Sequence, residues 1–178
     1  GDRFNVRLKL NLVTRDGVEK IDPVGVTANT GPGMGSQSSY GKYIFSPTQI
    51  AEDPDNAGRL YIGSGCEGVY VIEDGVELKK FDNTNSTINK HANYYCGTVS
   101  VTIDNEGNLW VCSRAGGEKH PIAILPADKR RLDPSEVTMD DWAIADYDLY
   151  LKVRDIKLLH CRHSGMIFGI DATDNRGF

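Results

Sequence analysis

The chain has 178 residues and a formal net charge of -5, with 25% charged and 39% hydrophobic residues. These proportions are typical of a folded globular domain, and the acidic balance disfavours nucleic-acid binding, which needs clustered Lys and Arg. No apolar run approaches the roughly 18 residues that a membrane-spanning helix requires, so no membrane span is predicted in this chain.

The N-terminal segment alternates apolar and polar residues with a period of two. One face carries the apolar side chains Phe4, Val6, Leu8, Leu10 and Leu12. This pattern indicates a half-buried strand, and the turn at Asp16-Gly17 predicts a β-hairpin within residues 4–27. Residues 28–42, which are rich in Gly and Ser, are predicted to form a loop.

From residue 43 onward, short strands are predicted to alternate with turns that contain Asp, Asn and Gly. The predicted strands cover 46–52, 59–64, 68–73, 76–81, 98–104, 108–113, 121–125, 142–148, 155–161 and 166–171. No segment has a sustained apolar period of 3.6 residues, and a single short helix is predicted with Asp133 as its N-cap and Pro134 at N1. The sequence therefore predicts an all-β fold.

Two groups of residues are predicted to have no chemical role. The basic run of Lys129, Arg130 and Arg131 is expected to be a solvated loop, because charge runs usually face water. The four cysteines are Cys66, Cys96, Cys112 and Cys161. They lack the CxxC spacing of a structural zinc site and are expected to be mostly buried thiols, although their even number also permits two disulfides.

A pattern of glycine, aliphatic and aromatic residues occurs three times in the chain. The copies are Gly58, Leu60 and Tyr61; Gly107, Leu109 and Trp110; and Gly165, Ile167 and Phe168. The gapless alignment of the first two copies also matches Asp55 with Asp104. In each copy the glycine is expected to close a turn, while the aliphatic and aromatic side chains point to opposite faces of a strand and pack against neighbouring sheets. Such a repeat is typical of the blades of a β-propeller.

The segments "IDNEGNLWVCS" and "EDPDNAGRLYIGSGCEGVYVIEDGVELKKF" resemble blades of the two-component regulator propeller family. The layout of residues 43–178 is similar to that of PorZ-like proteins, which are accessories of the type IX secretion system. Cys112 and Ser113 replace the usual Gly-Thr of the family, and the third copy has Arg162 where the turn Asp is expected.

The resemblance implies an incomplete β-propeller with about three to four blades' worth of chain. Residues 1–178 would form a single propeller segment. Within it, a hairpin from a preceding blade is expected at 4–27, two blades at 43–90 and 98–150, and the start of a further blade at 155–178.

No catalytic or metal-binding constellation is predicted, and no cofactor is expected. His160, Cys161 and His163 lie close in sequence but have no second ligand pair with metal-site spacing. Asp53 and Asp55 superficially resemble a calcium loop, yet turn formation accounts for them without a metal.

The resemblance implies a non-catalytic binding or scaffold module in the periplasm or at the cell surface. It would be either the ligand-sensing propeller of a two-component regulator or a PorZ-like component of the type IX secretion system, with the remaining blades in the full-length protein. The alternative is a glycan-active hydrolase or lyase on the same fold. Tyr40, Tyr94 and Tyr95 are candidate rim residues for a carbohydrate or protein ligand, unless these aromatic rings pack between blades.

Overall fold

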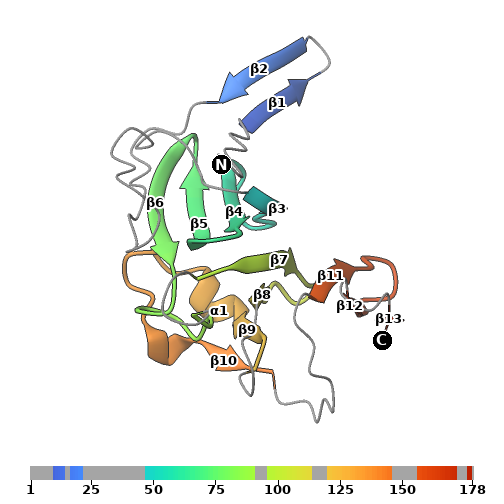
Figure 1. Cartoon of the computed structure of the whole chain (residues 1–178). Coiled ribbons are helices and arrows are strands. Elements are labelled where there is room, and N and C mark those ends of the chain that lie inside the picture. Colours follow the sequence, from blue (N-terminus) through green and yellow to red (C-terminus); the bar gives the residue numbers. More distant parts are fainter. Residues whose placement is uncertain are drawn as a thin grey trace, which may run out of the picture.

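The computed structural model describes residues 10–14, 17–21, 47–90, 96–113, 120–145, 156–171 and 176–177. These residues form four antiparallel sheets, accompanied by the short helix α1 (Ala127–Arg130) and the 3-10 helix η1 (Met139–Asp141). The chain is thus mostly β, as its sequence predicts (Figure 1). No helix in the described part of the chain is long and apolar enough to cross a membrane.

The N-terminal hairpin consists of β1 (Leu10–Thr14) and β2 (Gly17–Ile21). Thr14 pairs with Gly17, so the chain reverses where the Asp16-Gly17 pair predicts a turn. The rest of the predicted 4–27 hairpin and the predicted loop at 28–42 lie outside the described residues.

Three further sheets follow one another along the chain, and in each sheet the strands pair in sequence order. The first sheet contains β3 (Pro47–Glu52), β4 (Arg59–Ser64), β5 (Gly68–Glu73) and β6 (Val76–Phe81). The second contains β7 (Thr98–Ile103), β8 (Leu109–Ser113), β9 (Ile122–Leu125) and β10 (Ala143–Ile144). The third contains β11 (Ile156–His160), β12 (Ile167–Asp171) and β13 (Arg176–Gly177). β3 to β9, β11 and β12 coincide with predicted strands. Within the described part of the predicted strand 142–148, only the two residues of β10 are in a strand, and the two-residue β13 was not predicted.

The first strands of the three sheets are neighbours, with β7 lying between β3 and β11 (Figure 1). Polar side chains join these strands. The Thr48 hydroxyl of β3 donates to the carbonyl oxygen of Thr98 in β7 at 3.0 Å. The Ser100 hydroxyl of β7 accepts the backbone N–H of Leu158 in β11 at 2.9 Å and donates to the side chain of Gln49 in β3. Ser100 therefore links the first strands of three sheets through one hydroxyl.

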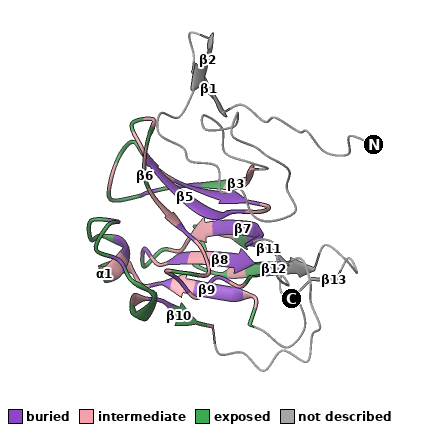
Figure 2. Cartoon of the chain, turned by 60° about the vertical axis from the view of Figure 1, so that its left-hand side comes forward, coloured by how far each residue is buried: buried purple, intermediate pink, exposed green. Residues whose placement is uncertain are grey.

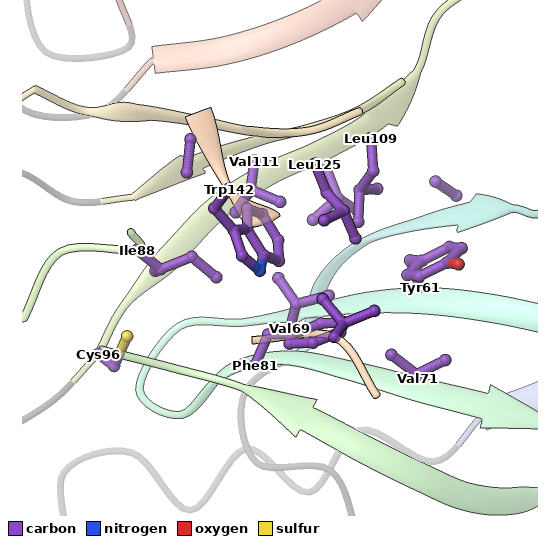
Figure 3. Packing of buried hydrophobic residues seen from close by; sticks show 14 residues of the cluster. Tyr61, Val69, Val71, Phe81, Ile88, Cys96, Leu109, Val111, Leu125 and Trp142 are labelled. Carbon is purple, nitrogen blue, oxygen red and sulfur yellow. The ribbon is translucent and has the colours of Figure 1, made fainter. Parts of the chain in front are cut away.

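The main hydrophobic core lies between the first and second sheets (Figure 3). Its buried side chains come from both sheets and from the segments that join them: Ala51, Tyr61, Val69, Val71, Phe81, Ile88, Cys96, Val101, Leu109, Val111, Ala123, Leu125, Val137 and Trp142. Phe81 at the end of β6 meets Trp142 edge-on, with the ring centroids 5.1 Å apart. Since burial of such side chains contributes about 1.5–3 kcal/mol each, this core couples the two sheets.

Strand β8 is buried on both faces because it lies in the middle sheet of the stack (Figure 2). Leu109 and Val111 face the first sheet, while Trp110 and Cys112 belong to a second cluster that includes Leu158 of the third sheet. The period of two thus places alternate side chains in different cores.

Two local expectations are wrong or incomplete. The helix predicted after Asp133 does not form: the Asp133 carboxylate accepts the backbone N–H of Ser135 at 2.8 Å and closes a turn, while the helices lie on either side of it. No disulfide joins the four cysteines, all of which lie in the described residues. Cys96 and Cys112 are buried as expected, whereas Cys66 and Cys161 are only partly buried.

Candidate functional site

The turn between the first two strands has an equivalent form in all three sheets. The residue that follows the first strand donates its backbone N–H across the turn: Asp53 to the Arg59 carbonyl oxygen at 2.9 Å, Asp104 to that of Asn108 at 3.1 Å, and Cys161 to that of Met166 at 2.9 Å. The repeat glycines Gly58, Gly107 and Gly165 close these turns with φ of 96°, 90° and 71°.

This equivalence corrects the alignment that matches Asp55 with Asp104. Asp53 is the counterpart of Asp104, because the first turn is two residues longer and a gapless comparison misplaces its acid. Cys161, rather than Arg162, occupies the corresponding place in the third sheet.

The turn acid holds the polar edge of the repeat aromatic on the next strand. The Tyr61 hydroxyl donates to Asp53 at 3.2 Å, and the Trp110 indole N–H donates to Asp104 at 2.7 Å. In the third sheet the aromatic is Phe168, which has no polar edge, and no acid precedes it. The carboxylate therefore accompanies a hydrogen-bonding aromatic and is missing where the aromatic has no donor.

Asp104 is held firmly in its turn. Its carboxylate accepts the backbone N–H groups of Glu106 and Asn108 at 3.0 and 2.8 Å, the Asn108 side-chain amide at 2.9 Å, and the Trp110 indole. Burial by itself would raise the pKa of this carboxyl, but these hydrogen bonds outweigh it and hold the pKa below its ordinary value. Asp104 is therefore an ionised, fixed negative charge at neutral pH.

The turn of the first sheet is bound to the second sheet by a buried arginine. The guanidinium of Arg130, in α1, donates to the carbonyl oxygen of Gly107 at 2.6 Å and forms ion pairs with Asp53 and Asp55. Arg131 adds a more exposed contact to Asp55 at 2.9 Å. The prediction that the whole basic run is solvated is thus wrong for Arg130, which is only 1% exposed. Its charge is matched by acids that are distant in sequence.

A first groove lies between the second and third sheets, and we call it the Trp110 groove. It has a volume of about 760 Å³. The residues that line it are Asp104, Asn105, Glu106, Asn108, Trp110, Ile122, Leu158, Gly165, Ile167 and Gly169. Its floor is apolar, and its polar side chains all come from the β7–β8 turn, so one end of the groove is acidic.

A second groove, of about 740 Å³, runs beside the first strands of the three sheets. Its polar lining includes both acids and bases: Gln49, Glu52, Asp55, Thr102, Asp104, Asn105, Glu106, Arg131, His160 and Arg162. The β7–β8 turn borders both grooves. Among the described residues, this turn is therefore our candidate ligand-binding site, because its polar side chains line both grooves.

The rim candidates Tyr40, Tyr94 and Tyr95 lie outside the described residues, so their role stays a prediction. The nine repeat residues are described and occupy turns and sheet faces. Cys161 and His163 lie in the turn after β11, outside the strand. Among the described residues, no three His, Cys, Asp or Glu side chains are grouped so as to hold a metal.

Sequence reasoning missed Arg130 and Ser100 as contacts between sheets. The Asp-to-aromatic spacing identified Asp104 before Trp110, but the same spacing before Tyr61 pointed to Asp55 and missed Asp53. No local signal distinguishes Arg130 from its basic neighbours, since its burial depends on acids that are distant in sequence. Asp53, for example, lies 77 residues before Arg130.

No family model matches the chain, and no curated protein matches it. A search of solved structures finds PorZ of Porphyromonas gingivalis, described as an essential bacterial surface component of the type-IX secretion system, with a TM-score of 0.51 and 18% sequence identity. The match covers 68% of this chain and 15% of PorZ, so the chain spans a small part of that protein's length. What the similarity establishes is a fold shared with a segment of PorZ.

Proposed function

We propose that this chain is part of a non-catalytic binding scaffold at the bacterial surface, built as a β-propeller of the PorZ kind. The observation that carries the proposal is the structural match to PorZ over 68% of the chain. The role of PorZ in type IX secretion is the function we transfer, while a ligand-sensing propeller of a two-component regulator is the related possibility on the same fold.

The arrangement of the sheets supports a propeller. Three sheets whose strands pair in sequence order follow one another, and their first strands β3, β7 and β11 lie together, as the inner strands of successive blades do. On the third sheet, Leu159 and Phe168 pair across β11 and β12 and are 53% and 42% exposed. Tyr61 and Trp110, at the position of Phe168, each contact the next sheet, so this face suits a further blade.

The use of the turn acids supports a role without catalysis. Asp53 neutralises Arg130 and accepts the Tyr61 hydroxyl, and Asp104 accepts four hydrogen bonds from its own hairpin. A general acid or nucleophile must change its protonation or bonding during turnover. The hydrogen bonds and the ion pair of these two carboxylates oppose such a change. Binding of a ligand in the grooves requires no such change.

The test removes the gene from its native bacterium and quantifies type IX cargo proteins in the cell envelope and the medium. We expect cargo to be lost from the surface, and we expect a wild-type copy of the gene to restore it. Unchanged cargo export would contradict the secretion role. Turnover of a glycan panel by the wild type, abolished in Glu106→Gln, would favour the hydrolase or lyase instead.

A further inference from the structure

We infer that the Trp110 groove binds an amphipathic organic ammonium ion, with the cationic head at the β7–β8 turn and the apolar body between the second and third sheets. The inference names a ligand class for the binding role proposed above and rests on it.

The floor of the groove suits the apolar body. Trp110, Ile122, Leu158 and Ile167 line it, and they are the side chains of the cluster between the two sheets. Gly169 pairs with Leu158 across β11 and β12, so the position that faces the groove beside Leu158 has no side chain. A volume of about 760 Å³ lies within the range of small-molecule sites, roughly 300–1,000 Å³.

The hydrogen-bonding groups at the turn favour a donor ligand. The side-chain amides and the indole of the turn already have partners: the Asn108 amide and the Trp110 indole donate to Asp104, and the Asn105 amide donates to the carbonyl oxygen of Arg162 at 3.1 Å. The exposed Glu106 carboxylate supplies acceptor oxygens, whereas Asp104, whose oxygens already accept four hydrogen bonds, adds negative charge. An ammonium ion donates to such acceptors and carries the opposite charge, whereas a sugar hydroxyl donates without any charge to offset that of the carboxylates.

The charge of the lining favours a cation. Among the described residues that line the Trp110 groove there are two acids and no Lys, Arg or His. Arg131 and Arg162 line the second groove, on the other side of the turn. The face of an indole also attracts cations, and the Asp104 carboxylate that accepts the Trp110 N–H polarises the ring in the favourable direction.

The test is an NMR titration of the ¹⁵N-labelled chain with three probes that share a six-carbon body: hexylammonium, hexan-1-ol and hexanoate. The chain has two tryptophans, so Trp142, in the core between the first two sheets, serves as an internal reference, and Trp110→Phe assigns the two indole signals. We expect hexylammonium to shift the Trp110 signal with an affinity about tenfold above that of hexan-1-ol, and hexanoate to leave it unchanged.

Glu106→Gln should weaken hexylammonium binding about three- to tenfold and leave hexan-1-ol binding unchanged. Glu136→Gln, an equal change of charge at another exposed site, is the matched control and should have no effect. Equal affinity for hexylammonium and hexan-1-ol, equal weakening by the two variants, or an unmoved Trp110 signal would overturn the inference. Cargo export and this titration are separate readouts, so loss of one leaves the other interpretable.

Discussion

At the scale of single residues, the stability of the turn region depends on one buried cation. Arg130 is enclosed between two sheets, and its guanidinium is matched by Asp53, Asp55 and the Gly107 carbonyl oxygen. A buried ion pair is not strongly stabilising by itself, because desolvation offsets the Coulomb attraction. Removing one partner is costly, because the other charge stays buried without compensation.

Arg130→Met is therefore expected to lower the free energy of unfolding by about 3–5 kcal/mol, since it leaves Asp53 buried and unpaired. Arg131→Met is the matched control: it removes a side chain that is 51% exposed and should cost less than about 1 kcal/mol. Urea denaturation followed by circular dichroism measures both. Equal losses in the two variants would show that Arg130 is no more than a surface charge.

At the scale of elements, the hairpins are defined by glycines in conformations that other residues rarely adopt. Gly68, at the start of β5, has φ of 88°, and a Cβ atom there would lie 2.0 Å from the Phe81 carbonyl oxygen. Gly75, in the turn between β5 and β6, has φ of 82° but nothing within 4 Å of a Cβ atom. A side chain at either position would strain the backbone, but only at Gly68 would it also collide with a neighbouring strand. Comparing the two positions therefore separates the two effects.

Gly75→Ala should cost about 1 kcal/mol of unfolding free energy, which is the strain of a left-handed conformation alone. Gly68→Ala should cost about 3 kcal/mol or more, because β5 must also move away from the end of β6. Thermal unfolding of the two variants and the wild type compares them directly. If Gly75→Ala were as damaging as Gly68→Ala, the close approach at Phe81 would not be the cause.

At the scale of the whole molecule, the sheets depend on one another. The middle sheet buries both faces of β8, one against the first sheet and one against the third. The first two sheets share the larger core, in which Phe81 and Trp142 come from opposite sides. They are therefore expected to unfold as a single cooperative unit.

Phe81→Ala should lower the unfolding free energy by about 4 kcal/mol through the cavity that it creates, and the loss should reach both sheets. Hydrogen exchange is the measurement: amides of β8 should lose protection together with those of β5. Leu78→Ala, at a site in the same strand that is 42% exposed, is the control. It should change the free energy of exchange of the β5 and β8 amides by no more than about 0.5 kcal/mol. Unchanged protection in β8 would mean that the sheets unfold separately.

The sequence alone determined the positions of the strands and the turns between them. Period-two alternation and turn residues are local signals, so β3 to β9 were predicted almost to the residue and Leu109 and Trp110 were correctly assigned to opposite faces. Where the local signal was ambiguous, as at Asp133, the predicted helix was wrong.

Only the tertiary structure decided which distant residues meet. The burial of Arg130 by Asp53, the equivalence of Asp53 with Asp104, and the groove beside Trp110 all depend on how separate hairpins stack. The physical reason is that a hairpin specifies its own hydrogen bonds, whereas the charge and shape complementarity between sheets arises between residues that the chain brings together only on folding.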